Sequence, residues 1–424
     1  MKTSLWLLTP RWRVVWFLAV AAALNFGDRT AMSAVLSAVQ TDLQISNVLL
    51  GLLGSVFLWS YAIGSPLAGG LADRYSRTKM VVGSLAAWSL VTGLIGLATN
   101  YPILLFLRFS LGLTECLFLP AAVALIATYH PPATRARAMS FITIGANCGM
   151  VLGGTAAGFF ADRYGWRSGF WALGSLGVGM ALSAKYLLPP PPAVVESTGE
   201  RKEKASFRQA VRYLLRVPSY YILLGESILS GLGMWIFFTW LPLYFRDAYK
   251  MTLASAGFAG TFMLQIAVVL GVMAGGWISD RAAAHAPHRR MLLYAIFYLV
   301  GGPFLLLFLG HATFPVVAFG ISMFSLMRGL AQANDYPIQC EIVPAQYRST
   351  GVGLMNACAT AAGGCGVFLA GFFKEDIGLG GIFGAISGIF VLAGALLALG
   401  YFICIRKDIA RAQAWTGFGA NLKT

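Results

Sequence analysis

The sequence is poor in charge, and poorest in acidic charge. Only 11% of its 424 residues are charged, and 16 acidic residues stand against 31 basic ones. A soluble domain carries about 25% charged residues, so the composition excludes a chain built from soluble domains. The mean hydropathy of +0.72 and the hydrophobic share of 58% predict a polytopic membrane protein instead.

Several functional motifs are also absent from the sequence. No G-x-x-x-x-G-K-[ST] loop occurs, and no polar stretch is long enough for a nucleotide-binding domain, so ATP is excluded as the direct energy source. We expect no cofactor, no metal site and no catalytic residue, and therefore no enzyme. The six cysteines form no CxxC pair and are interpreted as small, buried, apolar side chains.

The basic residues that produce the net charge of +15 lie in short loops between apolar runs. They form no single basic face, and we therefore expect no nucleic-acid partner. No cleavable signal peptide is evident, because the first apolar run is too long and carries charges. That run is predicted to stay in the protein as a membrane span.

The chain contains twelve apolar runs of the length that crosses a bilayer, roughly 20 residues each. They cover about 14–39, 48–71, 80–98, 102–128, 138–160, 169–188, 219–244, 254–279, 291–310, 314–340, 350–372 and 380–404. One long connection, 189–218, separates them into two groups, and from Ser206 it reads as a basic amphipathic helix on the membrane surface. We predict an all-α membrane protein with a six-helix bundle over 1–188, a cytoplasmic linker over 189–218 and a second six-helix bundle over 219–424.

The distribution of lysine and arginine predicts the orientation of the spans. With both termini in the cytoplasm, 23 of the 31 basic residues fall on that side, five on the other side and three within spans. Positive loops stay in the cytoplasm, so this asymmetry sets the topology. We expect a monomer in the lipid bilayer of a bacterial inner membrane.

An internal repeat is visible at the ends of four spans. The pattern Gly-x-x-x-acid ends at Asp73, Asp162, Asp280 and Glu375, with spacings of 89, 118 and 95 residues. The repeat unit is therefore three spans, and adjacent units have opposite orientation because three is odd. This plan of inverted three-helix repeats resembles the major facilitator superfamily (MFS).

The loop after the second span, "GGLADRYSRTKM", is similar to the signature loop of that superfamily. Two interpretations stay open: its basic residues anchor the topology, or its acid pairs with an arginine and forms a cytoplasmic gate. The gate interpretation involves Asp73, Arg74 and Arg77, with Asp280 and Arg281 at the equivalent place in the second half.

The charged residues in the interior of the spans are confined to the first helix of each repeat. They are Asp28, Arg29, Arg108, Glu115, Glu226, Arg328 and Asp335. Lys185, at the end of the run over 169–188, is counted with the cytoplasmic residues. Charged side chains avoid lipid, so these four helices are predicted to line a water-filled pathway. Arg108 and Glu115 are seven residues apart, which places both on one helix face. The alternative is a set of internal ion pairs that only fix helix packing.

A secondary transporter needs groups that exchange a proton, and buried carboxylates beside arginines suit this task. Asp28 and Glu115 are our candidates for proton coupling. Arg29 and Arg108 offer planar guanidinium groups that match a carboxylate on the substrate. Further candidates for substrate contact are Tyr61, Asn147, Glu226, Asn334 and Asn356. For the uncharged members, ordinary hydrogen bonding between helices is the alternative.

Five stretches resemble the anion:cation symporter family within the superfamily: "LNFGDRT", "LRFSLGLTE", "GANCG", "FFTWLPLYF" and "GVGLMN". The resemblance implies proton symport of a small organic anion, such as a sugar acid, through alternating access. It implies proton coupling by Asp28 and Glu115, anion binding or coupling by Arg29 and Arg108, and substrate contacts at Tyr61 and Asn356.

The sequence departs from that family at Phe26, where tyrosine is common, and at Glu226, Arg328 and Asp335. Spinster-like lysolipid carriers share the Asp-Arg pair of the first span and the Arg-x6-Glu spacing of the fourth, so transport of an amphiphile is the second hypothesis. A membrane sensor that uses the transporter fold without turnover is the third.

Overall fold

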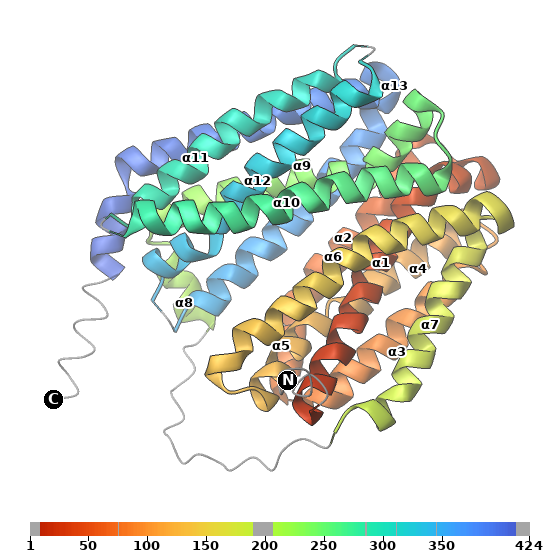
Figure 1. Cartoon of the computed structure of the whole chain (residues 1–424), viewed down its shortest axis with the longest axis horizontal. Helices are drawn as coiled ribbons and strands as arrows, with labels where there is room; N and C mark the ends of the chain where they lie inside the picture. The colour runs from red at the N-terminus through yellow and green to blue at the C-terminus, as the bar shows by residue number, and fades with distance from the viewer. Residues whose placement is uncertain are drawn as a thin grey trace, which may run out of the picture. The chain divides into compact units, whose positions relative to one another are not determined.

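The computed structural model describes residues 9–74, 76–189, 207–284, 286–310, 312–344 and 346–412, and these residues are almost entirely helical (Figure 1). No strand occurs in these ranges. The helices up to the long connection are α1 (Pro10–Leu43), α2 (Asn47–Arg74), α3 (Arg77–Ile95), α4 (Tyr101–Glu115), α5 (Phe118–Tyr129), α6 (Pro132–Tyr164) and α7 (Trp166–Leu187). Those after it are α8 (Phe207–Leu214), α9 (Pro218–Tyr249), α10 (Leu253–Ala283), α11 (Arg289–Gly301), η2 (Gly302–Phe308), α12 (Phe314–Ile342) and α13 (Arg348–Ile403).

Nine helices among the described residues are long and apolar enough to cross a membrane. One of them, α13, has 56 residues and contains a break at Gly378, where φ is +65° and the backbone leaves the helical conformation. Glycine adopts this conformation without steric cost, so two helices follow one another there. Each of the twelve predicted spans overlaps one of the helices. The all-helical membrane fold is confirmed, and the count of twelve spans stays a prediction because α1 and α7 fall outside the nine.

The chain folds into two compact units. The first unit comprises residues 1–199 together with 238–262 and 367–372, and the second comprises 200–237, 263–366 and 373–424. The first unit therefore includes the end of α9, the start of α10 and a short part of α13. The predicted division at 189–218 stays a prediction.

Helix α1 is held against α6 by a seam of small residues in the first unit, and the two helices run side by side in Figure 1. A Cβ atom on Gly149 would collide with the α1 backbone at Ala23, and one on Gly153 would collide with Gly27. Glycine is required here because only its missing side chain lets the two backbones approach so closely. The "GANCG" stretch thus fixes the position of α1, which carries Asp28 and Arg29.

Helices α2 and α4 are packed as closely in the same unit. A Cβ atom on Gly112 would collide with Ser60 and with the carbonyl of Phe57. This close approach brings the ring of Phe57 on α2 next to Arg108 on α4. The separation of the helices thus decides which aromatic rings reach the charged residues.

Helix α8 lies within the connection that we predicted to be amphipathic from Ser206. Ala210 and Leu214 are buried, while Arg208 and Arg212 are exposed. The described part of the connection is therefore an amphipathic helix with a basic face. Residues 190–206 lie outside the described part of the chain.

Cysteine burial differs from the interpretation of the sequence. Cys116 and Cys404 are buried, but Cys148 and Cys365 are exposed on helix surfaces. Apolar composition alone does not distinguish a side that faces protein from a side that faces lipid, because both environments accept a cysteine.

Candidate functional site

Four charged side chains meet inside the first unit: Asp28 and Arg29 from α1, and Arg108 and Glu115 from α4. We call these residues, with Asn25, the arginine–carboxylate cluster. Asp28 and Arg108 are 3% exposed, and Glu115 is 1% exposed. Charged groups are this deeply buried in proteins only when they are paired or functional.

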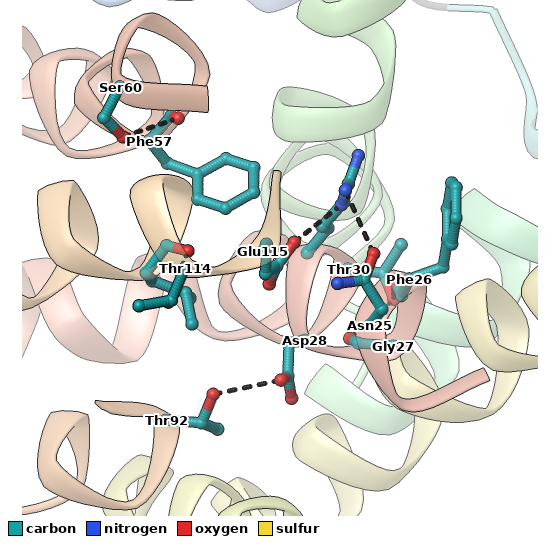
Figure 2. A network of polar contacts seen from close by, with 12 residues as sticks. Asn25, Phe26, Gly27, Asp28, Thr30, Phe57, Ser60, Thr92, Thr114 and Glu115 are labelled. Atoms are coloured by element: carbon teal, nitrogen blue, oxygen red, sulfur yellow. Dashed lines mark hydrogen bonds and ion pairs between the residues drawn. The ribbon is translucent and has the colours of Figure 1, made fainter. Parts of the chain in front are cut away.

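Arg29 is the hub of the cluster. Its Nε donates to Glu115 Oε2 at 3.0 Å, and its Nη2 donates to Asn25 Oδ1 at 3.0 Å. Figure 2 shows Asn25 and Glu115 converging from two helices, with a dashed line to each. The ion pair joins α1 to α4 across 86 residues of sequence.

Asp28 points away from this ion pair and reaches α3. The hydroxyl of Thr92 donates to Asp28 Oδ2 at 3.0 Å, and Figure 2 shows this contact as a dashed line between the two labelled side chains. The two carboxylates therefore have different partners: an arginine for Glu115 and a hydroxyl for Asp28. This asymmetry gives each carboxylate its own response to a proton.

Aromatic rings surround the two guanidinium groups. The Cζ atom of Arg29 lies 4.6 Å from the ring centroid of Tyr61 and 4.6 Å from that of Phe26. The Cζ atom of Arg108 lies 4.7 Å from the centroid of Phe57. Cation–π contacts of this kind stabilise a buried guanidinium without using its N–H donors. Phe26, which the resemblance marked as a departure, makes such a contact without a hydroxyl.

Several polar atoms of the cluster have no hydrogen-bond partner among the described residues. They are Asn25 Nδ2, Asp28 Oδ1, Arg108 Nε, Arg108 Nη1 and Glu115 Oε1. An unpaired buried donor or acceptor costs about 1–3 kcal/mol, so native proteins rarely keep several together without a purpose. The cluster thus offers free donors for an anion and free carboxylate oxygens for protons.

The predicted substrate residues are distributed over both units. Tyr61 joins it through Arg29. Asn147 is half-buried on α6, in the first unit, and Asn356 is exposed on α13. Glu226 and Asn334 lie in the second unit. The expectation that α1, α4, α9 and α12 line one shared pathway stays a prediction.

Asn334 is fully buried and belongs to another network. Its side chain accepts a hydrogen bond from Ser279 and donates to the carbonyl of Leu330. Ser279 in turn accepts from Arg290, whose Nη1 lies 3.0 Å away. The amide of Asn334 is therefore occupied in this conformation of the protein.

One of the two predicted gate residues of the second unit, Asp280, takes part in the same network. Arg290 pairs with Asp280 at 2.8 Å and with Glu341 at 3.0 Å, joining the ends of α10, α11 and α12. Arg281 instead stacks on Trp277, with its Cζ atom 3.9 Å from the ring. The sequence did not single out Arg290, because it reads there as one more basic loop residue.

The predicted gate residues of the first unit are only partly described. Arg77 Nη1 donates to Thr128 Oγ1 at 2.5 Å and to the carbonyl of Ala124 at 3.3 Å, which links α3 to α5. The side chains of Asp73 and Arg74 lie outside the described residues. The gate role of all five residues stays a prediction.

Two members of the site were missed by the sequence reasoning. Thr92 is a small hydroxyl residue in an apolar span, and Phe57 is one of 29 phenylalanines. Neither residue type carries a signal that separates a functional side chain from a packed one. Thr92 is recognised only by its contact with Asp28, and Phe57 only by its contact with Arg108.

A bundle of membrane-spanning helices with buried, partly unpaired charges defines a multi-pass membrane carrier. The comparison with known proteins agrees, because residues 18–366 match the Major Facilitator Superfamily. The chain belongs to this family, and it is an integral membrane transporter rather than an enzyme.

Similar proteins match most of the chain. A hexuronate transporter of Bacillus subtilis is 25% identical over 93% of both chains. A probable galactarate/D-glucarate transporter of the same organism is 29% identical over 64% of this chain and 65% of its own. The chloroplastic ascorbate transporter of Arabidopsis thaliana is 26% identical over 93% of this chain and 74% of its own.

Among solved structures, a bacterial homologue of the human lysosomal transporter Spinster superimposes with a TM-score of 0.77. It is 20% identical and covers 94% of this chain and 98% of its own. This likeness supports the fold.

Proposed function

We propose that the protein carries a small organic anion across the membrane together with protons, by alternating access. The placement that we propose is a bacterial cytoplasmic membrane with both termini in the cytoplasm. The relatives support an anionic substrate, since their names specify hexuronate, galactarate, D-glucarate and ascorbate.

The observation that carries the proposal is the state of Arg108. Its guanidinium is buried, and its Nε and Nη1 atoms have no hydrogen-bond partner among the described residues. A guanidinium donates two parallel hydrogen bonds to a carboxylate, and such charge-assisted bonds are about twice as strong as neutral ones. Nε and Nη1 lie on different edges of the guanidinium, so a carboxylate on the substrate would satisfy one of these free donors and a second polar group of the substrate the other.

The charge of the cluster explains why protons accompany the anion. Two carboxylates and two arginines sum to zero when all four are ionised. A bound anion alone would leave one uncompensated negative charge in a buried site, which is costly. A proton bound with the anion restores neutrality, so the two ligands favour each other's binding.

The ion pair between Arg29 and Glu115 supplies the geometry for this coupling. A proton on Glu115 weakens its hold on Arg29 at the 3.0 Å contact and frees the Nε donor. The freed guanidinium can then bind the anion beside Arg108. Asp28 and Glu115 are thus the proposed proton-coupling residues, and Arg29, Arg108, Tyr61, Asn147 and Asn356 the proposed substrate residues.

Uptake into proteoliposomes tests this function. Carboxylates, including a hexuronate and D-glucarate, are first screened for thermal stabilisation of the purified protein, and the best binder is radiolabelled. We expect accumulation only when the outside is acidic relative to the lumen. Glu115→Gln should abolish accumulation driven by the gradient and retain exchange of labelled for unlabelled anion.

Three other outcomes would contradict the proposal. Wild-type accumulation by Glu115→Gln would remove the proton role of this residue. Movement of lysolipid without anion accumulation would favour the amphiphile carrier predicted from the shared Asp-Arg and Arg-x6-Glu spacing. Binding without flux would favour the sensor hypothesis.

A further inference from the structure

The second unit contains a buried carboxylate that the proposed coupling does not use. Glu226 lies in α9 and is 2% exposed. The hydroxyls of Tyr294 and Tyr298, one turn apart on α11, are its hydrogen-bonding neighbours. The prediction that Glu226 contacts substrate stays a prediction, and the partners described here are side chains of its own unit.

A chain of hydroxyls extends from this carboxylate. Tyr298 is 3% exposed, and its hydroxyl lies 3.1 Å from the hydroxyl of Ser230, either of which can donate. A tyrosine hydroxyl donates one hydrogen bond and also accepts. Tyr298 can therefore accept a hydrogen bond from the O–H of a protonated Glu226 while it donates to Ser230. The hydroxyls of Tyr294 and Ser227 can donate to the carboxyl group, and Ser227 Oγ lies 3.4 Å from Glu226 Oε2.

Two further charged groups face Glu226, both from α12. Asp335 and Arg328 interact with it electrostatically. Asp335 accepts a hydrogen bond from Gln339 at 2.7 Å, and Arg328 donates to Gln332 at 3.2 Å. Helix α13 also packs against α9, with the Ala359 backbone beside Gly231 and the side chains of Phe390 and Leu396 beside Gly233 and Gly225, and none of these three residues is charged.

The charges of this group do not balance. We call Glu226, Arg328 and Asp335 the Glu226 cluster. When all three are ionised the cluster has one negative charge in excess, whereas the arginine–carboxylate cluster sums to zero. An uncompensated charge in a buried site is costly, so one positive charge is required. A proton supplies this positive charge and needs no cavity of its own.

We propose that Glu226 is a second proton-binding site of this carrier, located in the second unit and separate from the arginine–carboxylate cluster. Asp335 is the better stabilised anion of the two, because Gln339 donates a hydrogen bond to it and the positive charge of Arg328 opposes its protonation. Glu226 takes the proton because it is the more deeply buried carboxylate and its two tyrosines suit a carboxylic acid. The existence of this site does not depend on which solute the protein carries.

Infrared spectroscopy of the wild-type protein in lipid, without substrate, tests the site directly. A protonated carboxyl group has a C=O stretch that an ionised carboxylate lacks. We expect this band at neutral pH, and we expect Glu226→Gln to remove part of it. In protein synthesised in vitro with ¹³C-labelled glutamate, that part of the band should shift, which assigns it to a glutamate. We call this part the glutamate band. An unchanged band in Glu226→Gln would overturn the proposal.

Charge variants test the balance itself. Asp335→Asn removes the excess negative charge, so Glu226 should ionise against Arg328 and the glutamate band should disappear although Glu226 is intact. Arg328→Gln should keep the band. Asp376→Asn, at an exposed carboxylate of α13, is the matched control and should leave the band unchanged. Persistence of the glutamate band in Asp335→Asn would refute charge balance as its cause.

A metal cation is the other way to supply the charge. The spectra are therefore recorded in sodium and in choline salts at equal ionic strength. Loss of the glutamate band in sodium alone would show that Na⁺ replaces the proton and would overturn the assignment. The same band in both salts supports it.

The use of this proton in transport rests on the proposed function and has its own measurement. The reversal potential of uptake gives the number of protons moved with each anion, and we expect Glu226→Gln to reduce that number by one. An unchanged ratio with intact uptake would limit Glu226 to a proton that is bound but not transported, which contradicts a coupling role. Absence of wild-type uptake would contradict the proposed function and leave the infrared result standing.

Discussion

Arg29 Nε lies 3.0 Å from Glu115 Oε2, although the two residues are 86 positions apart in the sequence. The contact occupies a donor that an anion would need, so Glu115 and the anion compete for Arg29. A proton on Glu115 ends the competition, and this exchange is the physical basis of the proposed coupling.

Anion binding should therefore depend on pH in the wild-type protein and much less in Glu115→Gln. The neutral amide holds Arg29 weakly at every pH, so the variant should bind the anion more tightly at neutral pH. Since one charged hydrogen bond contributes about 1.5–3 kcal/mol, the gain should be roughly tenfold or more in Kd. Titration calorimetry at several pH values measures it. Equal pH dependence in both proteins would contradict the competition.

Arg108→Lys should weaken anion binding although the charge is preserved. Lysine is a point charge without the fixed planar set of donors of a guanidinium, so the loss should be about tenfold in KM. Initial rates of anion exchange give this value. Arg163→Lys is the control, because Arg163 is exposed and contacts Phe159 at the end of α6. An equal loss in both variants would point to a general effect of arginine replacement.

Gly149→Leu should prevent α1 and α6 from packing. The added side chain would collide with the backbone at Ala23, and overpacking of a tight contact costs typically about 1–3 kcal/mol. We expect a lower apparent melting temperature and a smaller monodisperse fraction after purification. Cys148→Leu, at the adjacent exposed position, should behave like the wild type. A stable, active Gly149→Leu protein would show that the seam tolerates separation.

Asp162 should stabilise the start of α10 within the first unit. Its two carboxylate oxygens accept from the backbone N–H groups of Leu253 at 3.1 Å and Ala254 at 3.0 Å. Loss of such a capping side chain costs about 1 kcal/mol. Asp162→Ala should therefore speed hydrogen exchange at these two amides severalfold. Asp162→Asn, which keeps one acceptor oxygen, should have a smaller effect, and equal exchange in all three proteins would exclude the cap.

His130 should make the protein sensitive to acid. Burial lowers the pKa of this imidazole, the positive charge of Arg11 lowers it further, and a hydrogen bond to the Arg11 carbonyl opposes both. The unfolded chain, with a histidine pKa near about 6.5, then binds a proton that the folded protein resists. The stability contribution of His130 is complete above that pH and declines as the pH falls.

The measurement compares the apparent melting temperature at pH about 7.5 and about 5.5, on either side of the ordinary histidine pKa. The wild type should lose more stability on acidification than His130→Gln. An equal loss in both would mean that other groups cause the acid sensitivity.

Much of the architecture was determined by the sequence alone. Span length follows from bilayer thickness, and a charged residue within a span is rare enough to be noticed. Asp28, Arg29, Arg108 and Glu115 could be selected on these grounds before any coordinates. The spacing of Arg108 and Glu115 also gave their shared face of α4, because helical periodicity is a local property.

The tertiary structure decided which side chains meet. A helix that is apolar on most sides carries no signal for its rotation about its own axis, and that rotation sets the neighbours of each side chain. Thr92 reaches Asp28 across 64 residues, and Asn334 binds Ser279 across 55. Such contacts depend on the close approach of whole helices, as at Gly149 and Ala23. Hydropathy fixes that a helix spans the membrane, while packing between backbones fixes the direction in which its polar groups point.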